Sequence, residues 1–218
     1  MTLAELRTQL RFILAEPSTG WLSDAQANVQ INLALAQVYQ AVLRNNENYF
    51  ATTSLITLVA DQETYTLPTT TRIIHVTRVD LEVEYSIPQI DIAQREMYLY
   101  QGVGGSTASN PWGLRYYFLG NTMGFLPVPG EAATDAIRVY HVPSSTALAA
   151  DGDSPPLEWP ADQQEVIALG AARRCQVRDK QRRAMVDAMY QEALEYLVRT
   201  TQMRNVDAPR GFVDVVWE

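Results

Sequence analysis

Two histidines are the residues of this sequence best suited to acid–base or metal chemistry. His75 and His141 each lie in a run with the alternating pattern of a β-strand, and neither has a histidine, cysteine or carboxylate neighbour at metal-ligand spacing. A histidine partly buried in a strand is a simpler interpretation than a ligand or a general base. A small hydrolase stays an alternative, and it would require one of these histidines to act with a nucleophile.

The other residues that could do chemistry do not form a recognisable set. Glu82 with Glu84, and Asp151 with Asp153, could bind a cation, but a solvated strand face and a polar loop explain these pairs with fewer assumptions. The run GVGGS at 102–106 lacks the lysine of a phosphate-binding loop, and no G-x-S-x-G elbow is present. We therefore expect no catalytic residues, no metal, no cofactor and no enzymatic activity.

A basic cluster lies towards the C-terminus, in the run ARRCQVRDKQRRA. It places six cations within eleven residues of an acidic protein: Arg173, Arg174, Arg178, Lys180, Arg182 and Arg183. One interpretation is a solvated helix surface with favourable charge near a helix end. The other is a docking face for an acidic protein surface or for DNA backbone passing nearby. The sequence alone leaves both open.

The tail NVDAPRGFVDVVWE, residues 205–218, is the second region that indicates a partner. It is too short to fold alone, and each large apolar side chain costs about 1.5–3 kcal/mol to leave in water. The apolar residues are Phe212, Val213, Val215, Val216 and Trp217. We expect them to pack on their own subunit or on another chain, where the tail could add a strand.

Composition bounds the remaining possibilities. The chain has 218 residues, of which 47% are hydrophobic, enough for one large domain or one domain with an insertion. The formal charge of −8 argues against general affinity for nucleic acid. The single cysteine, Cys175, excludes an intramolecular disulfide, and we expect it to be inert. Because no apolar run suits a membrane span or a secretion signal, we expect cytoplasmic synthesis and no membrane partner.

Helical patterns occupy both ends of the chain. Thr2 with Glu5, and Ser23 with Gln26, have the spacing of capping boxes, and each pair precedes an apolar stripe of helical period. The pattern resumes after residue 160 and runs to about residue 203. Its apolar residues are Val166, Leu169 and Val177 in a first segment, and Met185, Met189, Ala193, Tyr196 and Leu197 in a second.

The middle of the chain alternates apolar and polar residues as strands do. We expect residues 55–59 and 64–67 to form a hairpin around the turn ADQE. Residues 73–85 are expected to form one long strand, with a bulge near residues 75–77. A short helix in IDIAQREMYLY and a glycine-rich loop follow. Three further strands are predicted in the runs WGLRYYFLG, TMGFLPVP and AIRVYHV.

The predicted fold class is α+β: a helical bundle of two N-terminal and two C-terminal helices, with an inserted antiparallel β lobe and an extended C-terminal arm. The β lobe separates two helical segments that must find each other to bury their stripes. We assign residues 1–50 to the N-terminal helices and 51–145 to the β lobe. A connection and the C-terminal helices occupy 146–204, and the arm occupies 205–218.

Four stretches within roughly residues 50–180 follow one another in a recognisable order. They are TTSLITLVADQETYTLP, RIIHVTRVDLE, RYYFLGNTMGFLPVPGEAATDAIRVYHVP and DGDSPPLEWPADQQEVIALGAARRC. In this order, and with helices on both sides, the chain resembles the head-to-tail adaptor, or connector, proteins of tailed bacteriophages.

The resemblance implies a structural virion protein at the head–tail junction, assembled in the host cytoplasm. It implies a homo-oligomeric ring, commonly a dodecamer, that docks beneath the portal protein. Such a ring prolongs a channel through which DNA passes without sequence-specific binding, and it offers a platform to the tail or to a further neck protein. In that family, C-terminal arms often reach into the portal.

Two sets of residues would make these contacts. The arm would dock onto the portal or a neighbouring subunit through Phe212, Val213, Val215, Val216 and Trp217. The basic patch would face the portal or the channel through Arg173, Arg174, Arg178, Arg182 and Arg183. The alternatives are another neck protein, such as a tail-completion protein, and a nucleic-acid-binding module that uses the basic cluster.

Overall fold

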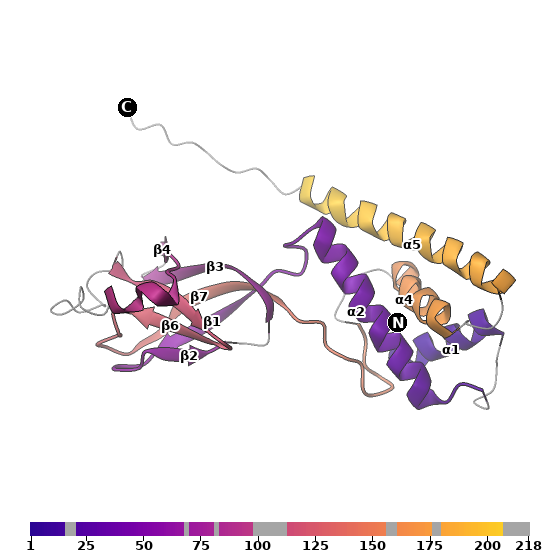
Figure 1. Ribbon diagram of the computed structural model, residues 1–218, viewed down its shortest axis with the longest axis horizontal. Helices are drawn as coiled ribbons and strands as arrows, with labels where there is room; N and C mark the ends of the chain where they lie inside the picture. The colour runs from indigo at the N-terminus through magenta and orange to yellow at the C-terminus, as the bar shows by residue number, and fades with distance from the viewer. Residues whose placement is uncertain are drawn as a thin grey trace. The chain divides into compact units, whose positions relative to one another are not determined.

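The computed structural model describes residues 1–15, 21–67, 70–80, 83–97, 113–155, 161–175 and 180–206. The chain forms two compact units, which we call the helical unit and the β unit. The helical unit contains residues 1–49 and 145–218, and the β unit contains residues 50–144 (Figure 1). The β unit is therefore an insertion into a helical unit built from both ends of the chain. The α+β fold class predicted from the sequence is confirmed.

Helices α1 (Leu3–Leu14) and α2 (Asp24–Asn45) begin where the capping boxes predict. The Thr2 hydroxyl accepts a hydrogen bond from the Glu5 amide, and the Glu5 carboxylate accepts one from the Thr2 amide. Ser23 and Gln26 make the same reciprocal pair at the start of α2. These contacts satisfy amides that the first turn of a helix leaves without partners.

Helix α4 (Ala161–Cys175) is the centre of the helical unit, because α1, α2 and α5 (Lys180–Val206) all pack against it. Residues 166–172 of α4 are buried without interruption. At Gly170 the neighbours come close: an added Cβ would lie 3.1 Å from the Tyr190 ring and 3.2 Å from the Ala34 side chain. Small residues in α4 thus let the surrounding helices approach it closely.

Helix α5 carries two apolar stripes, and only one of them faces the core. The buried stripe contains Val186, Tyr190 and Leu197. The pattern read from the sequence mixed the two stripes, since three of its five residues are 42–56% exposed: Met185, Met189 and Tyr196. The second stripe therefore lies on the surface of the helical unit.

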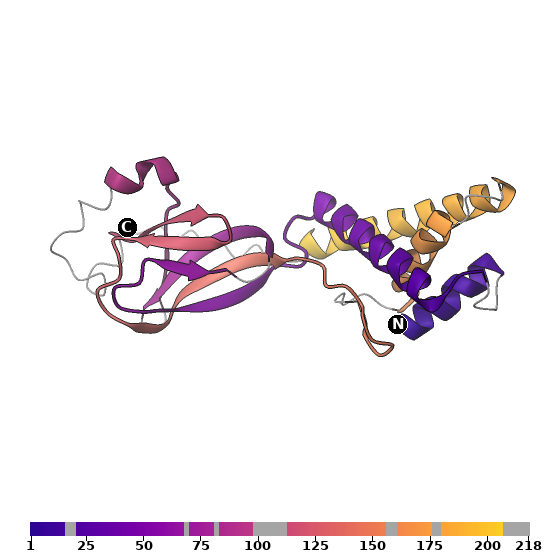
Figure 2. The same cartoon turned by 60° about the horizontal axis from the view of Figure 1, so that its bottom comes forward.

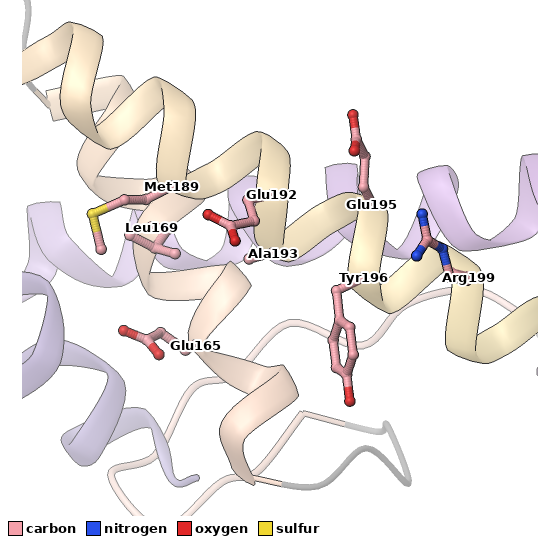
Figure 3. Close-up of a pocket in the computed structure, with 8 residues that line it drawn as sticks. All are labelled: Glu165, Leu169, Met189, Glu192, Ala193, Glu195, Tyr196 and Arg199. Carbon is pink, nitrogen blue, oxygen red and sulfur yellow. The ribbon is translucent and has the colours of Figure 1, made fainter.

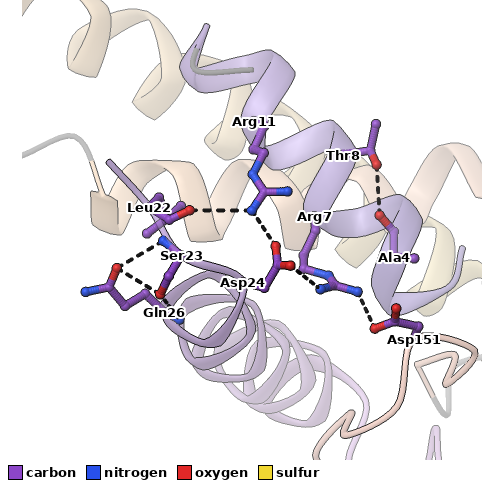
Figure 4. A network of polar contacts seen from close by, with 9 residues as sticks. All are labelled: Ala4, Arg7, Thr8, Arg11, Leu22, Ser23, Asp24, Gln26 and Asp151. Atoms are coloured by element: carbon purple, nitrogen blue, oxygen red, sulfur yellow. Dashed lines mark hydrogen bonds and ion pairs between the residues drawn. The ribbon is translucent and has the colours of Figure 1, made fainter. Parts of the chain in front are cut away.

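Ion pairs join α1 to the start of α2 and to the segment that follows the β unit (Figure 4). Asp24 pairs with Arg11 and lies 3.3 Å from Arg7, which also pairs with Asp151. The hydrogen bond from Arg11 is the main reason that the pKa of the Asp24 carboxyl lies below its usual value. The charge of the half-exposed Asp24 also complements the helix N-terminus on which it sits.

The segment at 145–155 is fixed to both N-terminal helices before α4 begins. The Asn32 side chain on α2 donates to the Leu148 carbonyl at 3.0 Å and accepts from the Leu148 amide at 2.8 Å. The Leu3 amide donates to the Asp153 carbonyl at 2.8 Å. These bonds guide the returning chain across α2 and α1 towards α4.

The β unit consists of two antiparallel sheets that share one core (Figure 2). The four-stranded sheet has the order β1–β7–β3–β4, and the three-stranded sheet has the order β2–β6–β5. The strands are β1 (Thr52–Leu58), β2 (Thr64–Thr66), β3 (Thr70–Asp80), β4 (Val83–Ser86), β5 (Arg115–Leu119), β6 (Thr122–Leu126) and β7 (Ala133–Pro143). The core includes Val76, Ile137 and Val139 from the first sheet, and Tyr65, Met123 and Phe125 from the second.

Two predictions about the strands are wrong, one in the pairing of strands and the other in the number of strands. Residues 55–59 and 64–67 form no hairpin, because β1 pairs with β7 and β2 pairs with β6. The chain crosses between the sheets there, and the Tyr65 hydroxyl holds the crossing by accepting from the Val59 amide at 3.0 Å. The segment 73–85 is also two strands, since β3 and β4 pair with each other. The other three predicted strands correspond to β5, β6 and β7.

The expected bulge in the first half of β3 is present. The register between β3 and β7 shifts between Ile73 and His75, at the edge of the predicted position. The short helix predicted after β4 is η1 (Ile92–Gln94), and the glycine-rich loop that follows lies outside the described residues.

A glycine lies directly beneath a tyrosine in the three-stranded sheet. Gly124 of β6 is opposite Tyr117 of β5, and a Cβ at this glycine would come within 2.2 Å of the tyrosine ring. The ring is buried, and its hydroxyl donates to the Glu63 carboxylate. Arg95, directly after η1, donates to both oxygens of Glu63 at 2.7 Å. Tyr117, Glu63 and Arg95 together fasten η1 to the sheet.

We expect Gly124→Ala to destabilise the β unit by about 1–3 kcal/mol, because the hydrogen-bonded Tyr117 ring has to move to admit a methyl group. Chemical denaturation followed by circular dichroism measures the free energy of unfolding. Gly130→Ala is the matched control, because nothing lies within 4 Å of the Cβ that the alanine would add. Its effect on the free energy of unfolding should stay within about 0.5 kcal/mol. Equal effects of the two substitutions would contradict this packing.

Candidate functional site

The two histidines lie on neighbouring strands but in different surroundings. His141 on β7 is buried, and its Nε2 lies 2.8 Å from the Ser54 hydroxyl on β1. Its Nδ1 has no hydrogen-bond partner among the described residues, so no carboxylate completes a catalytic triad there. His75 on β3 is exposed, with its ring 6.3 Å from that of Tyr140. The geometry of both histidines is that of side chains in a sheet.

Sequence reasoning missed the contact between Ser54 and His141. The two residues are 87 positions apart, and the pairing of β1 with β7 that joins them was not predicted. Burial lowers the pKa of His141, so the imidazole is held neutral. A neutral, buried imidazole that bonds one hydroxyl contributes to the structure of the sheet.

The acidic pairs are engaged by their own unit. The Asp153 carboxylate accepts from the amides of Ala149 and Ala150, which lowers its pKa. Glu84 pairs with Arg138 and accepts from the hydroxyls of Thr77 and Tyr140. Within the described ranges, no group of three or more His, Cys, Asp or Glu residues could hold a metal ion. Glu82 lies outside those ranges.

Cys175 ends α4 in a partly buried position. Burial raises the pKa of its thiol, and the nearby Arg174 only partly opposes this effect. At neutral pH the sulfur is therefore protonated, which disfavours nucleophilic chemistry.

The basic cluster has a defined geometry in its described part. Arg173 Nε lies 2.7 Å from Asp187 Oδ1 on α5, and Arg183 Nε lies 3.8 Å from Oδ2 of the same carboxylate. The Arg173 guanidinium also lies 5.4 Å from the centre of the Tyr190 ring. Arg174 donates to Gln30 on α2 at 3.3 Å. These arginines thus help to join α4 to its neighbours while Arg173 and Arg183 keep about half of their side-chain surface in solvent.

The remaining site residues predicted from the sequence are not placed. Arg178 and the arm residues Phe212, Val213, Val215, Val216 and Trp217 lie outside the described residues, and Arg182 belongs to α5 with a side chain outside the described part. Their role as contacts stays a prediction.

A surface groove follows the line where α4 and α5 meet (Figure 3). Glu165 and Leu169 of α4 line it, with Leu169 almost fully buried. Met189, Glu192 and Tyr196 extend from α5 on the same side, whereas Glu195 points away. The groove combines apolar side chains with carboxylates and the Arg199 guanidinium, and none of the residues that line it is a nucleophile, which suits contact with protein.

Comparison with known proteins gives one clear result. The family model described as SU10 adaptor protein matches residues 1–211, which include both units and the start of the arm. No curated protein matches the chain. In the part of the chain that the structure describes, no helix has the length and apolar character needed to cross a bilayer.

We expect the buried His141 to make the β unit less stable as the pH falls. Because burial lowers its folded pKa, the unfolded chain binds the proton more readily, and stability declines below the ordinary histidine pKa of about 6.5. His141→Gln keeps a polar side chain beside Ser54 and should reduce the dependence of the melting temperature on pH between pH 7.5 and 5.5. His75→Gln, at an exposed position of the neighbouring strand, is the control for replacing a histidine of this sheet. An unchanged slope in His141→Gln would contradict the assignment.

Proposed function

Because the chain belongs to the SU10 adaptor protein family, a family of bacteriophage structural adaptors, we propose that it is the head–tail adaptor of its virion. Copies of the chain form a ring beneath the portal, extend the DNA channel and carry the tail or the next neck protein. The observation that carries this proposal is the family match over residues 1–211, which is not confined to one unit. The helical unit serves as the base of the ring.

The arm at 205–218 is the proposed attachment to the portal or to a neighbouring copy. In the sequence, 12 residues follow the end of α5 at Val206, and fully extended they would span at most roughly 40 Å. Its apolar residues, with Phe212, Val215 and Trp217 as anchors, gain stability only by leaving water. An added strand or a filled apolar pocket would both supply this burial.

The basic patch is the second proposed contact. Arg173 and Arg183 share Asp187, which reduces the positive charge that a passing phosphate would meet. With a formal charge of −8 on the whole chain, the ring would not grip DNA during transfer of the genome. Arg173, Arg174, Arg178, Arg182 and Arg183 are therefore proposed to meet the portal, or to border the channel without specific binding.

A nucleic-acid-binding module is the alternative of a different class. Its affinity for DNA would fall steeply with salt concentration, whereas docking by an apolar arm would change little. A tail-completion protein is the alternative within the same class, and it would bind a tail component in preference to the portal.

Deleting residues 205–218 is expected to leave both units folded and to abolish portal binding, because the apolar anchors are lost. Co-sedimentation with purified portal protein measures binding, and circular dichroism checks the fold. A finer test is the double variant Phe212→Ala/Trp217→Ala, which should weaken binding roughly tenfold or more. Asp214→Asn in the same segment is the control and should bind like the wild type. Portal binding that survives the deletion would overturn the role of the arm.

A further inference from the structure

The outward face of α2 carries no charge. No charged residue occurs at positions 25–43, although exposed faces of helices normally carry charged residues. Val29 and Leu33 are 55% and 42% exposed on this face. Ala36 and Gln40 continue the same line and are also exposed. Loss of charge together with exposed apolar residues is typical of the centre of a protein interface.

The outer stripe of α5 has a complementary character. Met185, Met189 and Tyr196 are exposed, and Glu192 fills the position between Met189 and Tyr196. Figure 3 shows Met189, Glu192 and Tyr196 on one side of the helix. Methionine and tyrosine are enriched at interface centres. Glu192 and Arg199, which lies three residues beyond Tyr196 on the same line, add one charge of each sign.

The two surfaces share one spacing. Positions 29, 33, 36 and 40 on α2 and positions 185, 189, 192 and 196 on α5 both advance by four, three and four residues. This spacing places side chains along a seam that packs against another helix at a small crossing angle. The inward faces of α2 and α5 are already covered by α4. Among the described residues, no helix of the same copy covers either outward seam.

We propose that the α5 stripe of one copy packs against the α2 face of the next copy and that this contact closes the ring. The inference rests on the proposed function, because a ring needs two unlike surfaces on every subunit. Two α5 stripes facing each other about a two-fold axis would form a closed dimer and not a ring. An α2 face instead offers Gln40 and, beside the seam, the exposed Gln37, whose amides can donate to the Glu192 carboxylate. The occupant of each face is thus a second copy of this chain.

Cysteine cross-linking of the full chain tests the contact. In a Cys175→Ser background, Leu33→Cys and Met189→Cys are made singly and together. Assemblies of the purified chain, alone and mixed with portal protein, are treated with a short bis-maleimide and separated on a denaturing gel. The double variant is expected to give a ladder up to the size of the ring, and each single variant should stay monomeric. Leu33→Cys/Gln191→Cys is the control, since Gln191 is exposed about 200° around α5 from Met189.

The outcomes separate the interface from the function. Dimers from either single variant would show that like faces pair, and a double variant without a ladder would exclude the contact. Either result overturns the inference. If a ring still assembles in that experiment, the proposed function stands. Native mass spectrometry that finds no assembly with or without portal protein would contradict the function and the interface together. In addition, Leu33→Glu should raise the concentration for half-assembly roughly tenfold or more, and Gln191→Glu should not.

Discussion

Burial of α4 is the constraint on which the helical unit depends. Residues 166–172 are enclosed by helices that come from both sides of the β unit in the sequence. The core therefore forms only when the two ends of the chain meet, and the entropy of closing so long a connection opposes this step. The paired hydrogen bonds between Asn32 and Leu148 and the bond from Leu3 to Asp153 order the returning segment. Because these bonds order the segment before α4, they reduce the conformational entropy that is lost when α4 packs.

This way of building the core leaves the outer faces of α2 and α5 available. Since α4 satisfies the inward faces, the apolar residues that remain outside have no structural task within the described chain. The exposed Val29 and Leu33, on a stretch of α2 without charged residues, support the proposed contact between copies. The β unit has a separate core, in which Tyr117 over Gly124 and the Glu63–Arg95 pair fix the position of η1. Neither unit brings together a nucleophile, a base and an orienting group among the described residues.

Local signals in the sequence were reliable, and long-range pairing was not. The capping boxes at Thr2 and Ser23 determined the helix starts, because a cap depends on residues three positions apart. The predicted hairpin before residue 67 was wrong. Tyr65 is buried between the two sheets, and this burial places β2 in a different sheet from β1, its nearest neighbour in the sequence. Residues 81–82 contain neither the glycine nor the asparagine that marks a two-residue turn, so the end of β3 was invisible. The contact between Ser54 and His141 follows only once β1 is known to pair with β7. The two stripes of α5 could not be separated, because period alone does not say which stripe α4 covers.

The central proposal is that this chain acts as one member of a closed assembly of its copies. Cryo-electron microscopy of the neck of the intact virion tests it most directly. The account predicts a ring of copies directly beneath the portal, with α5 of each copy beside α2 of the next and DNA in the lumen. A map with this chain absent from the head–tail junction, or present there as isolated copies without mutual contact, would contradict it.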